Sequence, residues 1–213
     1  MSSEDNITCK VVLVGETGVG KTSIIQRYLL NSFTETLPST VTSSYSYKLL
    51  EYPKFKKSIS FDIWDTAGQE QYRSVAKNFY INAAVAVLVY DIRRRDSFEA
   101  IKEYWYDQLK ESGEDDMVIA IAGNKSDLFE EEEVPEDEAK QYAQSVGAIF
   151  QLTSCKKNFG IDELFKICGQ KYLENKKLIG IGNKMNDGKI KINNNKNDDN
   201  NGDTGKKKKK RFC

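Results

Sequence analysis

The stretch Gly15-Glu16-Thr17-Gly18-Val19-Gly20-Lys21-Thr22 decides the fold of this chain. It fits the pattern G-x-x-x-x-G-K-[ST], in which a glycine-rich loop turns its backbone N–H groups toward phosphate. The apolar run Cys9–Val14 is typical of a buried strand, and Ser23–Leu30 has the apolar spacing of a helix. Because a helix N-terminus adds its dipole and unpaired donors, we predict a P-loop, with Lys21 on the outer phosphates and the Thr22 hydroxyl on Mg²⁺.

Strands and helices alternate along the rest of the chain. We expect strands at 45–52, 58–64, 83–90, 118–122 and 148–152, and helices at about 96–112, 135–147 and 160–173. The strands at 45–52 and 58–64 should form an antiparallel hairpin at the sheet edge. Apolar runs such as 83–90 are typical of parallel strands covered on both faces. The prediction is an α/β fold with a six-stranded, mostly parallel sheet and about five helices.

Two polar motifs follow predicted strands, where open α/β sheets bind ligands. In Asn124-Lys125-Ser126-Asp127, the Asp127 carboxylate can accept two hydrogen bonds from a guanine edge, a donor pair that adenine lacks. In Asp65–Glu70, Asp65 can hold Mg²⁺ through water, the Gly68 N–H can approach a γ-phosphate and Gln69 can orient the attacking water. Together with the P-loop, these motifs predict a site for GTP or GDP with Mg²⁺.

Charge and cysteine content indicate the cellular compartment of the protein and the surfaces that it meets. The 213 residues have zero net charge, but residues 174–213 carry 12 Lys and Arg against 5 Asp and Glu, so the tail is basic and the body acidic. The four cysteines have neither metal-like spacing nor the arrangement of a disulfide framework. The polar N-terminus is unlike a signal peptide, and no apolar run approaches the length of a membrane span, so we expect a cytosolic protein.

The motifs occur in one family order, and the chain resembles a Ras-superfamily small GTPase of the Rab family over about residues 8–174. The resemblance rests on GETGVGKT, Thr40, WDTAGQE, NKSD and Thr153–Lys156. The sequence of the chain between Ser97 and Leu164 is similar to that of the endosomal Rab branch. The resemblance implies a P-loop NTPase G domain at 8–174, a short extension at 1–7 and a disordered, hypervariable tail at 175–213.

The resemblance also assigns roles residue by residue. Thr40 is similar to the threonine that binds Mg²⁺ and senses the γ-phosphate, and Phe33 to the aromatic residue beside the guanine. Lys125 should cover the base, the Cys155 N–H should meet its O6, and Lys156 should stack beside it. The expected catalytic residues are Lys21, Thr40, Gly68 and Gln69, and the expected Mg²⁺ ligands are Thr22, Thr40 and, through water, Asp65. The expected nucleotide-binding set is Glu16, Thr17, Gly18, Val19, Gly20, Lys21, Thr22, Ser23, Phe33, Thr40, Asp65, Gly68, Asn124, Lys125, Asp127, Ser154, Cys155 and Lys156.

Three features depart from the Rab pattern. After Thr40 most Rabs read I-G-x-x-F, whereas this chain reads Val41-Thr42-Ser43-Ser44-Tyr45 on the surface that meets effectors. Leu37 stands where an aromatic side chain often shields the phosphate. The chain ends in one cysteine, Cys213, after Lys206–Phe212, in place of paired cysteines or a C-a-a-X box, and prenylation of Cys213 is a hypothesis.

The expected function is a GTP-hydrolysing switch for vesicle trafficking on the cytoplasmic side of an intracellular membrane, with an endosomal membrane as the candidate and with a cytosolic pool. We expect a monomer with Rab-type effectors, exchange factor and activating protein, without a nucleic-acid partner. The alternatives are a Ras- or Rho-like signalling GTPase, a GTP-dependent scaffold that hardly hydrolyses, and a GTPase whose lysine tail binds RNA. The cysteine beside the lysines favours a membrane, because one lipid chain plus a polybasic patch makes a stable anchor.

Overall fold

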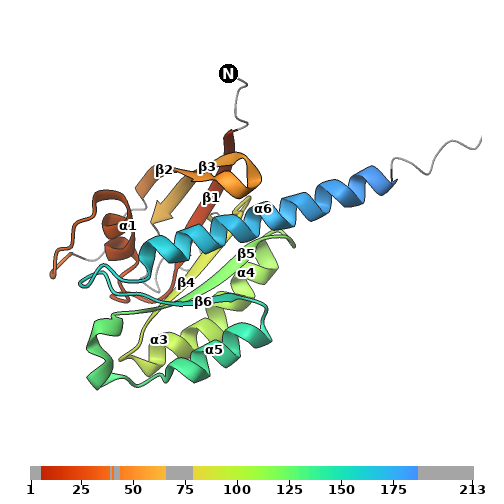
Figure 1. The fold of residues 1–213 in the computed structure, drawn as a ribbon. Helices are drawn as coiled ribbons and strands as arrows, with labels where there is room; N and C mark the ends of the chain where they lie inside the picture. The colour runs from red at the N-terminus through yellow and green to blue at the C-terminus, as the bar shows by residue number, and fades with distance from the viewer. Residues whose placement is uncertain (1–5, 39, 41–43, 66–78, 187–213) are drawn as a thin grey trace, which may run out of the picture. The chain divides into compact units, whose positions relative to one another are not determined.

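A six-stranded sheet forms the centre of the protein (Figure 1). The computed structural model describes residues 6–38, 40, 44–65 and 79–186. The strands are β1 (Asn6–Val14), β2 (Ser44–Tyr52), β3 (Lys57–Asp65), β4 (Val85–Asp91), β5 (Val118–Asn124) and β6 (Ile149–Leu152), in the order β2-β3-β1-β4-β5-β6. Only the β2–β3 pair is antiparallel among the described strands, which confirms the predicted hairpin and the mostly parallel sheet.

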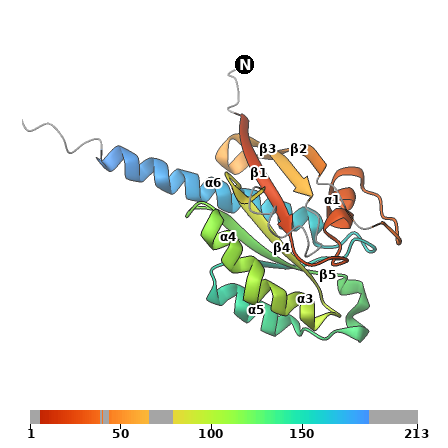
Figure 2. The same ribbon diagram turned by 180° about the vertical axis from the view of Figure 1, so that it is seen from behind.

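Helices cover both faces of the sheet. The helical elements are α1 (Lys21–Leu30), η1 (Pro53–Phe55), α3 (Arg95–Ala100), η3 (Ile101–Trp105), α4 (Tyr106–Ser112), η4 (Ser126–Glu131), α5 (Glu136–Ser145) and α6 (Ile161–Asn186). The helices α1 and α6 lie over one face, and α3, α4 and α5 lie over the other (Figures 1 and 2). The five α-helices of the described part match the predicted number.

Two apolar cores follow from this layering. Alternate residues of β1 point to opposite faces, so that Val11 and Leu13 join the core under α1 and α6, while Val12 and Val14 join the core under α3 to α5. β4 and β5 are buried along their whole length, as the apolar runs predict. The carboxyl ends of the parallel strands therefore lie together at one end of the sheet, on top of a packed core.

The helix predicted at 96–112 contains a turn that the sequence did not indicate. The α-helical segments α3 and α4 are joined by the π-helical turn η3, from which the Trp105 indole N–H donates to Glu16 Oε1 at 3.0 Å. π turns are rare and have no marked sequence signature, which explains why the pattern missed it. The turn connects this helix to the P-loop.

The predicted end of the last helix near Leu173 is wrong, because α6 continues to Asn186. Just past the expected end, Asn175 Nδ2 donates to the Asp116 carbonyl at 3.4 Å, and Lys176 Nζ pairs with the Asp116 carboxylate at 3.0 Å. These contacts stabilise the helix beyond its apolar stripe. The tail predicted as disordered from residue 175 therefore starts as helix, and residues 187–213 lie outside the described residues.

Candidate functional site

A pocket of about 400 Å³ opens beside the P-loop and the ends of β4 and β5. Its walls come from the P-loop and α1, the loop after α1, and the segments that follow β4, β5 and β6. It is lined by Thr17, Gly18, Gly20, Lys21, Thr22, Ser23, Phe33, Glu35, Leu37, Pro38, Thr40, Arg93, Asn124, Lys125, Asp127, Leu128, Cys155 and Lys156. A pocket at this edge is where parallel α/β sheets bind ligands.

Two glycines let the P-loop take its shape. Gly15 and Gly20 have φ angles of 141° and 100°, which residues other than glycine rarely adopt. A Cβ atom on Gly15 would collide with the Val89 carbonyl, and one on Gly20 would collide with the Asn124 amide. The loop therefore fits closely between the ends of β4 and β5.

Side chains bind the carbonyl groups of the P-loop. Lys21 Nζ donates to the Gly15 carbonyl at 2.8 Å and to the Glu16 carbonyl at 3.0 Å. Lys125 Nζ donates to the Gly18 carbonyl, and Asn124 Nδ2 to the Val19 carbonyl, each at 2.8 Å. α1 begins after Gly20 without a side-chain cap, which leaves the N–H groups of its first turn available to an anion.

Lys21 is the cation at the floor of the pocket. It is 6% exposed, and burial lowers the pKa of its ammonium group to about 8, although Asp65 and Glu16 oppose the shift. A buried ammonium group without an anion is costly. A phosphate beside Lys21 would relieve this cost.

Three oxygen-bearing side chains from separate elements meet at Thr22. Its Oγ1 lies 2.7 Å from Asp65 Oδ2, at the end of β3, and 2.6 Å from Thr40 Oγ1. Asp65 is 2% exposed, and its Oδ1 has no hydrogen-bond partner in the described part of the chain. Burial raises the Asp65 pKa, against the effects of Thr22 and Lys21. Hard oxygen donors with an unsatisfied carboxylate oxygen suit Mg²⁺.

A second cluster lies at the ends of β5 and β6. Ser154 Oγ donates to Asp127 Oδ1 at 2.6 Å, and Thr153 Oγ1 donates to Asn124 Oδ1 at 3.1 Å. Ser154, Thr153 and Asn124 are all buried. The Ser154 bond fixes the Asp127 carboxylate at the pocket wall, where it can accept the two donors of a guanine edge, and the Thr153 bond orients the Asn124 amide.

Arg27 connects the aromatic wall of the pocket to the loop after β6. Its guanidinium lies 6.0 Å from the centre of the Phe33 ring, and its Nε donates to the Cys155 carbonyl at 2.8 Å. Lys156 Nζ pairs with Glu35 Oε1 at 3.2 Å across the same opening. Phe33 and Cys155 are thus held on one side of the pocket.

Comparison with known proteins shows the family of the chain. The family model described as "Ras family" matches residues 10–174. The chain is 46% identical to Ras-related protein Rab-31 of Mus musculus over 157 residues, which is 74% of this chain and 79% of the relative. It is 44% identical to Ras-related protein Rab-22A of Homo sapiens over 156 residues, 73% of this chain and 79% of that protein. It is 39% identical to Ras-related protein RHN1 of Nicotiana plumbaginifolia over 164 residues, 77% and 80% of the two chains.

This chain belongs to the Ras family. Among the relatives given above, two are Rab proteins, and the predicted Rab resemblance is confirmed. The protein is a small GTPase, a GTP-binding switch in vesicle trafficking that hydrolyses GTP to GDP and phosphate. As a member of this family it has exchange factors, activating proteins and effectors as partners in general. No helix within the described ranges is long and apolar enough to cross a bilayer.

Most of the site residues predicted from the sequence of this Ras-family chain line the pocket. Four of them lie behind its walls: the Asp65 carboxylate reaches Thr22, Ser154 supports Asp127, and the Glu16 and Val19 carbonyls bind Lys21 and Asn124. Three others, Gly68, Gln69 and Cys213, lie outside the described residues.

The sequence did not indicate several lining residues. Glu35, Pro38, Arg93 and Leu128 border the pocket, yet none belongs to a motif. For Arg93 the one visible signal is the run of three arginines directly after an apolar strand. A charged run of this kind is usually a solvated surface, so it gave no reason to place Arg93 at the site.

Proposed function

We propose that this pocket holds a guanine nucleotide, with its phosphates at the P-loop and its base against Asp127. The observation that carries the proposal is the convergence of Thr22, Thr40 and Asp65, which come from α1, the following loop and the end of β3. The buried Asp65 Oδ1, which has no hydrogen-bond partner among the described residues, supports a cation site beside these hydroxyl groups. The P-loop and Lys21 bind the phosphates beside it.

Thr22 and Thr40 would hold Mg²⁺, with Asp65 acting through water. When bound, the ion would neutralise charge on the β- and γ-phosphates. The buried Asp65 carboxylate would orient Thr22 for this role, because the Thr22 hydroxyl donates to it at 2.7 Å. Lys21 would add a second positive charge at the phosphates.

The base would lie between the Lys125 stem and the Phe33 ring. Asp127 would accept from the N1–H and exocyclic amine of guanine, and the Ser154 hydroxyl, which donates to Asp127 Oδ1, would keep the carboxylate in this orientation. The Cys155 N–H would meet guanine O6, and Lys156 would stack beside the base. Adenine has neither donor pair nor acceptor at these places, so the site would prefer GTP and GDP over the adenine nucleotides.

Hydrolysis would switch the state of the two loops around the γ-phosphate. Gln69 would orient a water molecule, the water oxygen would bond to the γ-phosphorus, and the bond to the β–γ bridging oxygen would break to give GDP and phosphate. Thr40 and the Gly68 N–H would lose their contact with the departing phosphate. The loops would then relax and release effectors.

The chain would work as a monomeric G domain at 8–174 preceded by an extension at 1–7. The tail would attach to the cytoplasmic face of an intracellular membrane, with an endosomal membrane as the candidate, through Lys206–Arg211 and a prenyl group on Cys213. A cytosolic pool would remain. The basic run beside a cysteine supports this arrangement, because one lipid and a polybasic patch act together. No nucleic-acid partner is proposed.

Competition binding tests the nucleotide assignment. Purified protein loaded with a fluorescent GDP should exchange it for GTP at least about 100-fold more readily than for ATP, since an unmatched buried carboxylate is costly. Asp127→Ala should lose this preference, while Ser126→Ala, one residue away, should keep it. Equal competition by ATP and GTP in the parent protein would refute the proposed site.

A further inference from the structure

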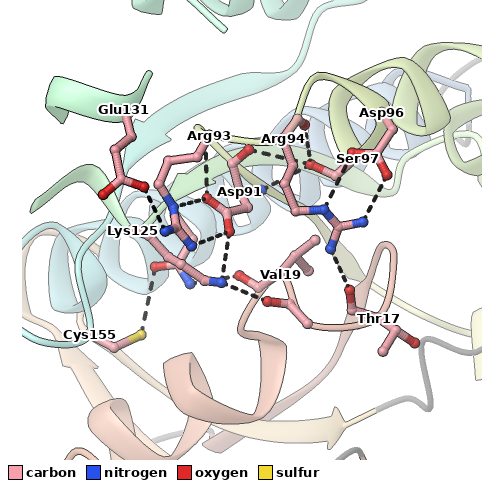
Figure 3. Close-up of polar contacts among 12 residues, drawn as sticks. Thr17, Val19, Asp91, Arg93, Arg94, Asp96, Ser97, Lys125, Glu131 and Cys155 are labelled. Carbon is pink, nitrogen blue, oxygen red and sulfur yellow. Dashed lines mark hydrogen bonds and ion pairs between the residues drawn. The ribbon is translucent and has the colours of Figure 1, made fainter. Parts of the chain in front are cut away.

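Three consecutive arginines, Arg93–Arg95, follow β4, and each has a different partner. Figure 3 shows the first two, Arg93 and Arg94. Arg93 binds the buried Asp91, Arg94 reaches the P-loop, and Arg95 binds α5. The Arg94 and Arg95 side chains are 37% and 40% exposed, so they differ in partner more than in burial. The sequence alone gives all three the appearance of a solvated basic turn.

Arg94 donates from Nη1 to the Thr17 carbonyl at 2.8 Å, across 77 residues of sequence. Its guanidinium is oriented by Asp96, which accepts from Nη2 at 2.9 Å and from Nε at 3.3 Å. The Arg94 backbone is fixed as well, because the fully buried Ser97 hydroxyl donates to the Arg94 carbonyl at 2.7 Å. Figure 3 shows the guanidinium between Asp96 and Thr17. The side chain is therefore preorganised toward the P-loop.

Arg93 acts on the neighbouring part of the P-loop through two intermediates. Its guanidinium bonds to both oxygens of Asp91, which is 0% exposed, and Asp91 Oδ2 pairs with Lys125 Nζ at 2.7 Å. Lys125 in turn donates to the Gly18 carbonyl at 2.8 Å. Burial raises the pKa of Asp91, but the hydrogen bonds from Arg93 and Lys125 lower it by more, so that the pKa lies below its usual value. Asp91 therefore stays ionised and holds Lys125.

Three successive P-loop carbonyls are consequently bound from the ends of β4 and β5. The Thr17, Gly18 and Val19 carbonyls accept from Arg94, Lys125 and Asn124. Of these donors, Arg94 is the one that no binding motif contains. We propose that Arg94 is a positioning residue, which holds the P-loop in its phosphate-binding conformation through the Thr17 carbonyl and thereby slows nucleotide release.

This inference rests on the proposed function, because it needs a nucleotide in the pocket. Release of bound phosphates requires the P-loop N–H groups to move away from them, and this motion stretches the hydrogen bonds on the opposite, carbonyl side of the same peptide units. A bond from a charged donor is stronger than one between neutral groups, so its loss should show mainly in the release rate.

The test compares Arg94→Ala with Arg95→Ala in the full chain loaded with a fluorescent GDP analogue. Dissociation is started with excess unlabelled GDP at fixed Mg²⁺ concentration. Arg94→Ala should release the nucleotide about tenfold faster, which corresponds to about 1.4 kcal/mol. Arg95→Ala removes an equal charge from the next position and should release at the parent rate. Arg94→Lys keeps the cation and should restore part of the slow release.

A second readout separates positioning from general destabilisation. Arg94→Ala loses its ion pair with Asp96, and Arg95→Ala loses ion pairs with Glu99 and Glu138. Because ion pairs between such exposed side chains contribute little to stability, Arg94→Ala should not have a markedly lower urea midpoint than Arg95→Ala, while its release rate should be higher. If Arg94→Ala does not fold, Asp96→Asn takes its place in the test. This variant keeps Arg94 but weakens its orientation, and it should release the nucleotide faster than the parent but less than tenfold faster. Equal release by Arg94→Ala and Arg95→Ala would overturn the inference. Failure of the parent chain to retain GDP would overturn the proposed function and the inference with it.

Discussion

Among single residues, Thr22 is the one whose hydroxyl group joins the proposed metal ligands of the site. It contacts both Thr40 and Asp65 and is the proposed first ligand of Mg²⁺. Thr22→Ala should make GDP release insensitive to removal of Mg²⁺ by a chelator, whereas the parent should release GDP faster after chelation. Thr22→Ser keeps the hydroxyl and should behave like the parent. A parent-like chelator response in Thr22→Ala would remove Thr22 from the metal site.

Lys21 gives the site a pH dependence. Burial lowers its pKa from 10.5 to about 8 in the free pocket, so above pH 8 the free protein carries mostly neutral Lys21. Phosphate favours the charged form, and nucleotide binding should therefore take up a proton at pH 8.5 to 9 and weaken as pH rises further. Calorimetry in buffers of different ionisation enthalpy measures this uptake directly. Binding without proton uptake at pH 9 would contradict the assigned role.

Some residues of the site could be predicted from the sequence, and others could not. The P-loop and Asp127 were recognisable because each sits in a motif of fixed spacing. Thr40 could be assigned only through the family resemblance, since a lone threonine in a loop has no distinguishing pattern. Arg94 could not be assigned at all, because its partner, Thr17, lies 77 residues away and the contact depends on the fold.

At the scale of elements, the buried strands were predictable because β4 and β5 are continuous apolar runs. The π turn η3 and the extension of α6 were not, since both depend on contacts with distant residues. Trp105 bonds to Glu16, and Lys176 pairs with Asp116. Propensity and periodicity describe local preferences, and these two features are set by tertiary structure.

The extension of α6 predicts a stability difference between two shortened chains. A chain ending at Glu174 loses the contacts of Asn175 and Lys176 with Asp116, while a chain ending at Asn186 keeps them. Because Lys176 is 48% exposed, the difference in unfolding free energy should be about 1 kcal/mol or less. Urea unfolding of both chains measures it, with Asp116→Asn in the longer chain as a control. A higher urea midpoint for the chain ending at Glu174 would rule out a stabilising role for these contacts.

At the scale of the whole molecule, the charge is divided between an acidic body and a basic tail. If the tail serves the membrane and the G domain serves the nucleotide, the two should be separable. Deleting Lys206–Arg211 with Cys213 retained, or changing Cys213→Ser, should leave nucleotide binding and hydrolysis unchanged and reduce binding in cells to membranes. Imaging of the tagged variants beside the parent measures the effect. A vesicle pattern that survives in both variants would exclude the proposed anchor, and a nuclear pattern in the parent would favour the RNA-binding alternative.

A switch driven by GTP hydrolysis must cleave the GTP that it binds, and single-turnover hydrolysis of preloaded GTP measures this cleavage. The parent should release phosphate slowly, at about 10⁻⁴ to 10⁻³ per second, by analogy with related GTPases. Gln69→Leu should bind GTP with the same affinity and turn it over more slowly still. Bound GTP that stays intact in the parent would exclude a hydrolysis-driven switch and favour a binding scaffold, and equal turnover in parent and Gln69→Leu would exclude the role of Gln69.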